Sequence, residues 1–319
     1  MIESLKFVQG AVAKKDFAAE LTHFSIKDGI ILGYNGNLSL SSPIDLDWDI
    51  YPKAIPFVKT IEACKERVVL SKTKNGRLSV KSGSFQAFVE CLEEDVFPHQ
   101  QPEGEYVPLQ GDFIPAIKNI LDFIGVDASR PWATGILFDG DKAYATNNII
   151  IAEQQLPDAF PVRINVPSYA IKELLRVKLI PIAVQSTDSS VTFHFEGGRW
   201  MRSQLYSNSW PEAMYRILGA PSNQVKVPEG FFEALETIQP FLEKNNSVYF
   251  EPDSLSTSQE KGDGATVEVP GLVAGASFQF KPLYSLMGKI DTIDFSQYPK
   301  PCIFKGEGLT GAIVGMVRG

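Results

Sequence analysis

Three aspartates occupy alternate positions in residues 44–50: Asp45, Asp47 and Asp49. Side chains on a β-strand alternate between its two faces, so this spacing predicts three carboxylates on one face of a strand. Carboxylate oxygens are the ligands that Mg²⁺ and Ca²⁺ prefer. No histidine or further carboxylate lies nearby in the sequence to complete a coordination shell. The pattern therefore favours a solvated strand face over a metal site.

Other arrangements that support catalysis are absent from the sequence. The histidines His23, His99 and His194 are scattered, which favours neither a catalytic triad nor a metal-binding pair. No GxxxxGK[ST] loop for phosphate occurs. The three cysteines, Cys64, Cys91 and Cys302, have no paired spacing that indicates zinc or a disulfide framework. These patterns favour no class of enzyme, no metal and no cofactor, and they leave an enzyme possible in principle.

Basic residues instead recur on predicted amphipathic helices. Leu5, Val8 and Val12 have the spacing of one buried helical face, and Lys6 and Lys14 lie on other faces. Further predicted helices show Lys59, Lys118, Lys172, Arg176 and Lys289 in the same way. Such residues form either a solvated surface or a surface that contacts phosphate groups. The predicted helix that begins near Phe231 differs, because glutamates take the exposed positions.

The elements that carry these helices repeat three times along the chain. In each copy a proline, Pro56, Pro167 or Pro282, opens a helix, and two or three strands follow it. The interval is about a third of the chain, far longer than the roughly 20–50 residues of a solenoid repeat. A linker rich in Pro, Gln and Glu follows Phe97, and a second lies near Gly219. We therefore predict three tandem domains, residues 1–105, 106–218 and 219–319.

Composition is that of an ordinary globular protein, with 44% hydrophobic and 21% charged residues among 319. No run of about 18 apolar residues indicates a membrane span, and the start of the sequence has no signal pattern. We expect a cytoplasmic protein. The net charge of −8 argues against a protein that coats nucleic acid with its whole surface. A local basic face remains compatible with it, because charges more than about 10 Å apart are largely screened.

Residues 149–151 are three consecutive isoleucines on a predicted strand. Because alternate side chains point to opposite faces, at least one of them lies on the outer face. The run therefore predicts either a strand covered on both faces or an exposed apolar patch.

Several stretches, in the same order and at similar spacing, resemble the bacterial-type sliding clamp, the β subunit of DNA polymerase III. The likeness covers essentially the whole chain. Residues 45–50, DLDWDI, resemble the family pattern DLEMEM; residues 77–83, RLSVKSG, resemble RMLVRSG; and residues 95–98, DVFP, resemble a segment ending in DFP. Residues 134–139 and 144–152 resemble NGMLFE and VATDGHRLA, and residues 166–176 resemble VPRKGVIELMR.

The resemblance implies an α+β fold of three tandem DNA-clamp domains that form half of a six-domain ring. Two chains would close head to tail into a homodimer around double-stranded DNA. Such a protein is a processivity factor rather than an enzyme, and it tethers DNA polymerase and is handled by a clamp loader. The chain is shorter than typical family members, which favours a divergent or virus-encoded version.

The resemblance also assigns surfaces to particular residues. Helices that face the hole would present Lys6, Lys14, Lys59, Lys118, Lys172, Arg176 and Lys289 to phosphates without regard to sequence, and Trp132 aligns with a segment that touches DNA. The joint between chains would use Phe85, Ala87, Phe88 and Val89 against Phe241 and Leu242.

A cleft between domains two and three would take a short apolar peptide from each partner. The matching positions are Ala133, Thr146, Asn148, Ile149, Ile150, Ile151, Leu218, Ile313, Val314, Met316 and Arg318. This role favours the exposed-patch interpretation of the isoleucine run. Family members read Gly-His-Arg at residues 148–150 and end in a Met-Pro-Met-Arg-Leu pattern, so the preferred peptide is expected to differ.

Two other functions remain open at this point. The first is a clamp-like scaffold that gathers replication or repair proteins without encircling DNA, as the acidic third-domain helix suggests. The second is a carboxylate-dependent nuclease built on Asp45, Asp47 and Asp49.

Overall fold

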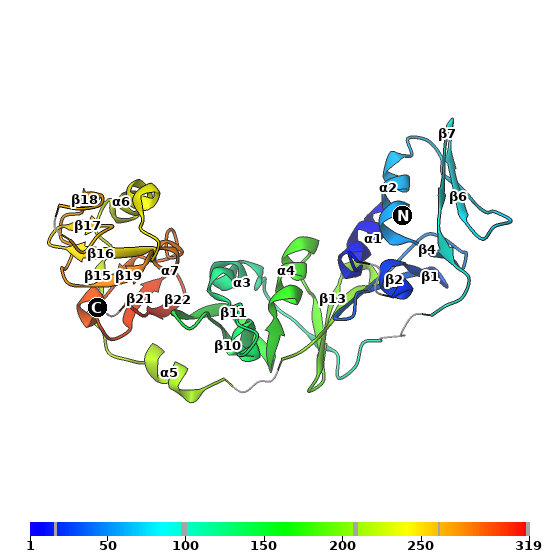
Figure 1. Cartoon of the computed structure of the whole chain (residues 1–319). Helices are drawn as coiled ribbons and strands as arrows, with labels where there is room; N and C mark the ends of the chain where they lie inside the picture. The colour runs from blue at the N-terminus through cyan, green and yellow to red at the C-terminus, as the bar shows by residue number, and fades with distance from the viewer. Residues whose placement is uncertain (16–17, 97–100, 207–209, 261, 317–319) are drawn as a thin grey trace. The chain divides into compact units, whose positions relative to one another are not determined.

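The structure is a computed structural model, and it describes residues 1–15, 18–96, 101–206, 210–260 and 262–316. The chain forms two compact units (Figure 1). Unit 1 comprises residues 1–112 and 169–205, and unit 2 comprises residues 113–168 and 206–319. Each unit thus contains one end of the chain and part of the predicted middle domain.

Unit 1 is built around a seven-stranded sheet in the order β1-β2-β3-β14-β13-β12-β9, with a separate three-stranded sheet β5-β6-β7 and a small pair β4-β8. Helices α1 and α2 lie side by side (Figure 1). The helices are α1 (Ile2–Val8), α2 (Ala54–Ala63) and α4 (Ser168–Val177). The strands are β1 (Ser25–Lys27), β2 (Ile30–Tyr34), β3 (Leu38–Pro43), β4 (Tyr51–Pro52), β5 (Val69–Lys72), β6 (Leu78–Ser82), β7 (Phe85–Val89), β8 (Cys91–Leu92), β9 (Val107–Pro108), β12 (Ala183–Ser186), β13 (Ser190–Phe195) and β14 (Arg199–Gln204).

Unit 2 has a six-stranded sheet, β10-β11-β22-β21-β20-β15, and a four-stranded sheet, β18-β17-β16-β19. Its helices are α3 (Ile114–Ile120), α5 (Glu212–Leu218), α6 (Phe231–Ile238) and α7 (Phe280–Tyr284), with the 3₁₀ turns η3 (Leu121–Phe123) and η6 (Gln239–Phe241). The strands are β10 (Gly135–Thr146), β11 (Ile150–Pro167), β15 (Val225–Lys226), β16 (Ser247–Glu251), β17 (Ser254–Ser256), β18 (Thr266–Glu268), β19 (Ser277–Gln279), β20 (Thr292–Ile293), β21 (Cys302–Gly306) and β22 (Leu309–Ile313).

One antiparallel strand pair in each unit joins segments that are distant in sequence. In unit 1, β3 pairs with β14, with Leu40 opposite Met201. In unit 2, β11 pairs with β22, with Ala152 opposite Gly311. Each pair crosses a predicted domain boundary and makes one continuous sheet. The predicted boundaries at residues 105 and 218 therefore stay predictions. In each unit, a continuous sheet joins strands from both sides of one boundary.

The predicted strand over residues 44–50 is wrong. β3 ends at Pro43 and the next strand begins at Tyr51. The alternation is still present as burial, because Ile44 and Ile50 are buried while Asp45, Asp47 and Asp49 are exposed. Pro43 lacks a backbone N–H, which suits the end of a strand. An in-and-out pattern of side chains is therefore not sufficient evidence for a paired strand.

The isoleucine run is covered on both faces. Ile150 and Ile151 are 1% and 5% exposed, and Ile149 is half-buried. Ile151 packs in an apolar cluster with Trp210 and Leu218. The alternative of an exposed apolar patch is therefore wrong, because helix α5 and its flanking residues cover the outer face of β11.

Candidate nucleic-acid interface and docking surfaces

The predicted DNA-facing lysines are mostly exposed side chains on helices. Lys59 lies on α2, Lys118 on α3 and Lys172 on α4, and all three are exposed. Lys14 is exposed beyond α1. These side chains are available to bind phosphate oxygens as flexible point charges, which carries no base specificity.

Lys6 has a partner on the neighbouring helix. Its Nζ lies 2.8 Å from Oε1 of Glu62, and both side chains are about half exposed. An exposed ion pair of this kind stabilises a protein by roughly 0–1 kcal/mol. The Lys6 ammonium can therefore exchange Glu62 for a phosphate at small cost.

Arg176 has a different setting, because its guanidinium already has several partners in unit 1, although 41% of the side chain is exposed. Its Nε donates to both carboxylate oxygens of Glu173 at 2.8 and 2.9 Å. Its remaining nitrogens donate to the backbone carbonyls of Lys6, at 3.0 Å, and Phe7, at 2.6 Å, in the last turn of α1. Carbonyls at the end of a helix lack partners within the helix, and a cation satisfies them well. Arg176 thus fastens α4 to α1.

Glu173 is the buried member of this group, with 8% of its side chain exposed. Its carboxylate lies where a side chain on Gly10 would be. A Cβ built at Gly10 would fall 1.7 Å from Oε1 of Glu173. Glycine at position 10 is therefore required for the carboxylate to reach Arg176 in its present position.

Lys289 makes the corresponding contact in unit 2. Its Nζ donates to the carbonyl of Asn119, in the last turn of α3, at 2.9 Å and to Oδ2 of Asp122 at 2.7 Å. It also lies 4.9 Å from the centre of the Phe123 ring, a cation–π contact. Only 15% of the Lys289 side chain is exposed, whereas Asp122 is 61% exposed. We call the β3–β14 pairing with the Arg176 contacts seam 1, and the β11–β22 pairing with the Lys289 contacts seam 2.

Trp132 belongs to an aromatic group in unit 2 rather than to an open loop. Its ring packs edge-on against Trp210 at 5.6 Å, and its carbonyl accepts hydrogen bonds from Asn165 and Trp210. Tyr144 packs against both Trp210 and Tyr215. Burial and the nearby Glu153 carboxylate raise the pKa of the Tyr144 hydroxyl above its usual range.

The residues assigned to the peptide cleft fall into two groups. Ala133, Thr146, Ile150, Ile151 and Ile313 are buried, and Leu218 is 9% exposed. Asn148 and Val314 are exposed, and Ile149 and Met316 are half-buried. Arg318 lies outside the described residues. Most of this set is therefore buried and does not itself present a surface to a partner.

Asn148 replaces a glycine of the family pattern in a tight turn. Its φ is +70°, in the left-handed region that asparagine tolerates better than most residues. Asn147 Oδ1 accepts the backbone N–H of Ile150 at 2.7 Å, and Thr146 Oγ1 donates to the Ile150 carbonyl at 2.7 Å. Side-chain hydrogen bonds from Asn147 and Thr146 therefore hold the turn between β10 and β11.

A groove of about 560 Å³ lies in unit 2, between α5 and the segment before β21. We call it the α5 groove. Its walls include Ala213, Ile217, Pro221 and Ile303, and the cations Arg216 and Lys300 also line it. None of the sequence motifs predicts this groove. The signal was present in α5, where Ala213 and Ile217 share one face at helical spacing.

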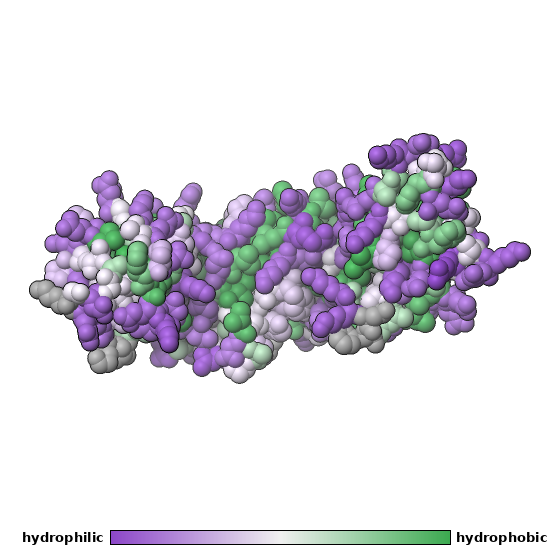
Figure 2. Space-filling model, turned by 45° about the horizontal axis from the view of Figure 1, so that its top comes forward, coloured by the Kyte–Doolittle hydropathy of each residue, from purple (hydrophilic) through white to green (hydrophobic). Residues whose placement is uncertain are grey.

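The residues predicted for the joint between chains lie at two separate places. On β7, Phe88 is 55% exposed, Phe85 and Ala87 are half-buried, and Val89 is buried. At the end of η6, Phe241 is 62% exposed and Leu242 is half-buried. Exposed aromatic side chains of this size are typical of protein–protein contacts. On the face drawn in Figure 2, hydrophilic side chains cover most of the surface between smaller apolar patches.

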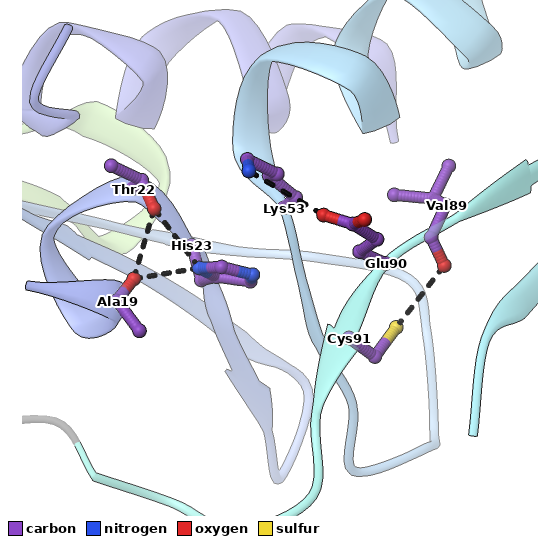
Figure 3. Close-up of polar contacts among 7 residues, drawn as sticks. All are labelled: Ala19, Thr22, His23, Lys53, Val89, Glu90 and Cys91. Carbon is purple, nitrogen blue, oxygen red and sulfur yellow. Dashed lines mark hydrogen bonds and ion pairs between the residues drawn. The ribbon is translucent and has the colours of Figure 1, made fainter. Parts of the chain in front are cut away.

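Polar contacts hold the start of α2 against the strands near β7 (Figure 3). Lys53, the residue before α2, lies 3.4 Å from Oε2 of Glu90. His23 is 6% exposed, and its Nδ1 donates to the Ala19 carbonyl at 2.6 Å. Burial raises the pKa of the nearby Cys91 thiol. These contacts are structural, and among the described residues no group of three His, Cys, Asp or Glu side chains could hold a metal ion.

No helix among the described residues is long and apolar enough to span a membrane.

Neither a protein-family model nor a curated protein sequence matches the chain. Solved structures do match it. The β subunit of DNA polymerase from Streptococcus pyogenes is 18% identical, with a TM-score of 0.83 over 99% of this chain and 97% of that one. The Caulobacter crescentus β sliding clamp, with polyethylene glycol in its putative β-motif tethering region, is 16% identical, with a TM-score of 0.82 and the same coverage.

The Bartonella birtlesii sliding clamp bound to griselimycin is 15% identical, with a TM-score of 0.81 over 99% of this chain and 97% of that one. At such identities the agreement concerns the path of the backbone. Over nearly its whole length, this chain has the fold of bacterial DNA polymerase III β sliding clamps.

Proposed function

We propose that the protein is a DNA sliding clamp, a processivity factor whose two chains close head to tail around duplex DNA. The observation that carries this proposal is the likeness to solved β clamps over practically the whole of both chains. Two seams of the same design support it, because a repeated joint is what a ring of similar domains requires. The three predicted domains, 1–105, 106–218 and 219–319, would supply half of that ring.

DNA contact in this proposal comes from exposed lysines that bind phosphates and leave base edges unread. Lys59, Lys118 and Lys172 are the best candidates, with Lys6 and Lys14 beside them. Arg176 and Lys289 contribute indirectly, since their charges already serve the helix ends of the two seams. A few such contacts allow sliding, because the link to DNA is topological and the tethered polymerase stays at high effective concentration.

The α5 groove is our candidate for the partner site, taking a short apolar peptide from DNA polymerase or a clamp loader. Its apolar walls would hold the hydrophobic side chains, and Arg216 and Lys300 would attract carboxylates that flank them. Griselimycin, which the Bartonella birtlesii clamp binds, is a suitable probe. We expect the variant Ile217→Glu to lose about tenfold or more in griselimycin affinity, a change of about 1.4 kcal/mol. Val225→Glu, an exposed residue that does not line the groove, should bind as the unchanged protein does.

Encirclement is tested with nicked circular DNA. The protein is incubated with the circle, separated from unbound chains by gel filtration, and then challenged by linearising the DNA. Retention on the circle and release after linearisation support a ring, because only a topological link depends on closed DNA. Equal loss from both forms contradicts encirclement and favours a clamp-like scaffold.

Light scattering provides the companion measurement. A mass of about twice 35.2 kDa supports the homodimer. A stable monomer at micromolar concentration contradicts it. DNA cleavage in Mg²⁺ or Mn²⁺ that disappears in a variant with Asp45, Asp47 and Asp49 changed to Asn would contradict the proposal that the protein is not an enzyme.

A further inference from the structure

The first helix of each repeated copy ends in the same way. α1 ends at Val8, α3 at Ile120 and α6 at Ile238, and a 3₁₀ turn of three residues follows each helix without a gap. These turns are η1 (Gln9–Ala11), η3 and η6. The last turns of the three helices can therefore be aligned residue by residue.

Burial supports this alignment. The last residue of each helix is fully buried, and so is the residue three positions before it: Leu5, Ile117 and Leu235. The residue before each of these is small and also buried: Ser4, Ala116 and Ala234. Side chains three or four positions apart lie on one face of a helix. The three helices therefore pack on their units through equivalent residues.

One exposed position lies inside this buried frame. It is the residue directly after the first fully buried one, and it is Lys6 in α1, Lys118 in α3 and Glu236 in α6. Lys6 and Lys118 belong to the predicted DNA-facing set. Glu233, one turn before Glu236, is exposed as well, and α6 contains no lysine or arginine. The third copy thus reverses the charge at the position where the other two present a cation.

Helix α7 holds the Glu236 carboxylate in place. The Tyr284 hydroxyl donates to Oε1 of Glu236 at 2.6 Å. The Tyr284 ring in turn stacks on Phe280, with ring centres 5.3 Å apart, and Phe280 is buried. Lys6 likewise meets Glu62 on the second helix of its own copy. The equivalent position is therefore tied to the neighbouring helix in both copies, but with opposite charge.

A carboxylate at this position acts against contact with phosphate. Each lysine that neutralises a phosphate releases counterions and adds about 0.9 to the slope of log affinity against log salt concentration. Glu236 makes no such contact and repels phosphates within a screening length of about 8–10 Å. A protein that is linked to DNA by topology needs little affinity, and each further phosphate contact must be broken before the protein can slide.

We propose that Glu236 limits the affinity of the protein for duplex DNA. Its carboxylate keeps backbone phosphates away from α6, so that contact with DNA falls to the helices of the first two copies. The inference rests on the proposed clamp function, and it adds a residue whose replacement should tighten DNA binding. The acidic face of α6 is then part of the DNA-facing surface and not a site for a separate partner.

Salt-dependent binding to a short labelled linear duplex tests this role, with fluorescence anisotropy as the measurement. Glu236→Lys restores a cation at the third equivalent position. It should raise the affinity by about fivefold or more at about 0.1 M salt, because it adds a phosphate contact and removes a repulsion. The slope of log affinity against log salt concentration should steepen by about 1.

The matched control is Asp188→Lys, in an exposed turn between β12 and β13, which changes the net charge by the same amount. This variant should bind as the unchanged protein does, because a charge away from the DNA is screened. An equal gain in Asp188→Lys and Glu236→Lys would show that net charge alone sets the affinity, and it would overturn the inference.

Two further variants separate the charge of Glu236 from its hydrogen bond. Glu236→Gln keeps an acceptor for Tyr284 and removes the charge, so it should raise the affinity by about twofold without steepening the salt dependence. Tyr284→Phe removes the hydrogen bond and keeps the charge, so it should not raise the affinity. Glu236 is exposed, and both substitutions at this position are expected to retain the fold. No gain in either Glu236 variant would overturn the inference.

The reciprocal variant Lys118→Glu distinguishes failure of this inference from failure of the proposed function. It should weaken binding to the duplex and lower the salt slope by about 1. If Lys118→Glu weakens binding and Glu236→Lys does not strengthen it, the role of Glu236 is wrong and the DNA-facing lysines stand. If the unchanged protein neither binds the duplex nor stays on nicked circles, the proposed clamp function fails, and the role of Glu236 fails with it.

Discussion

Seams 1 and 2 share one backbone arrangement but are stabilised by different side chains. Each joins two sheet segments through an antiparallel pair and places a cation at the carbonyl end of a helix. In seam 1 the cation is an arginine that also binds a buried carboxylate, Glu173. In seam 2 it is a lysine that faces an exposed carboxylate, Asp122, and an aromatic ring. The backbone arrangement is thus repeated, while the side chains that secure it are not.

The difference follows from the geometry of the two cations. A guanidinium has five donors in a planar fork and can bind a carboxylate and two carbonyls together, whereas an ammonium is a compact point charge with three donors. In seam 1 the carboxylate is buried and the cation is partly exposed, whereas in seam 2 the cation is largely buried and the carboxylate is exposed. Seam 1 therefore depends on one network around a buried carboxylate, and seam 2 on separate contacts of one lysine. The two seams should respond unequally to matched substitutions.

Arg176→Ala should have the largest effect. It leaves the Glu173 carboxylate buried without its cation, and removal of one partner of such a pair costs about 3 kcal/mol. Chemical denaturation measures the loss in the free energy of unfolding. Lys172→Ala, on the exposed side of α4, is the control and should stay within about 0.5 kcal/mol of the unchanged protein. An effect for Arg176→Ala as small as that of the control would show that the network does not stabilise unit 1.

Gly10→Ala should cost about 2 kcal/mol, because its Cβ would overlap the Glu173 carboxylate and displace it from Arg176. A double-mutant cycle with Glu173→Ala locates the cause. If the clash is responsible, Gly10→Ala should have a much smaller effect once the carboxylate has been removed. Strict additivity of the two substitutions would point instead to the backbone at position 10.

Lys289→Ala should destabilise the protein by about 1 kcal/mol, less than Arg176→Ala. Its carboxylate partner is mostly exposed, so water replaces the lost ion pair, and the main losses are one carbonyl hydrogen bond and the cation–π contact. Denaturation in low and high salt checks this explanation. The difference in the free energy of unfolding between the unchanged protein and Lys289→Ala should shrink only slightly in high salt. If that difference disappears in high salt, the exposed ion pair is the main contribution.

His194 should give the smallest effect, which is a dependence of the stability of unit 1 on pH. Burial lowers the pKa of its imidazole below the usual value of 6.5, and its Nε2 donates to Gln185 Oε1 at 2.7 Å. The unfolded chain therefore binds a proton more readily than the folded chain. The contribution of neutral His194 to stability is present above pH 6.5 and declines as the pH falls from 6.5 through the folded-state pKa. Chemical denaturation at pH 7.5 and at pH 5.5 gives the free energy of unfolding at each pH. Between these two pH values, His194→Gln should lose less stability than the unchanged protein. An equal loss would contradict the assignment of this pH dependence to His194.

Much of the fold could be predicted from the sequence, because periodic burial and helix-opening prolines are local signals. The buried face of Leu5 and Val8 on α1, and the helices that begin close to Pro56, Pro167 and Pro282, are as predicted. The motif resemblance predicted the clamp fold. The strand over residues 44–50 was wrong because alternate burial also arises in an irregular segment that lies against a core.

The functional surfaces were harder to predict, because they depend on contacts between distant segments. Nothing local to Arg176 or Lys289 indicates that their charges meet carbonyls some 170 residues away in the chain. The cover over the isoleucine run likewise comes from Trp210 and Leu218, remote from Ile151 in sequence. Sequence periodicity identifies the exposed face of a helix but not the segment that later packs on it. The roles of the exposed lysines and of β7 stay predictions.

The pairing of β3 with β14 also has a consequence for synthesis of the chain. Leu38 meets Ser203, so the amino-terminal region leaves the ribosome long before its neighbouring strand exists. Native contacts of such long range are formed late and leave strand edges transiently unprotected. A fragment that stops at the first predicted boundary would keep β3 as an open edge permanently. We therefore expect residues 1–105 produced alone to aggregate.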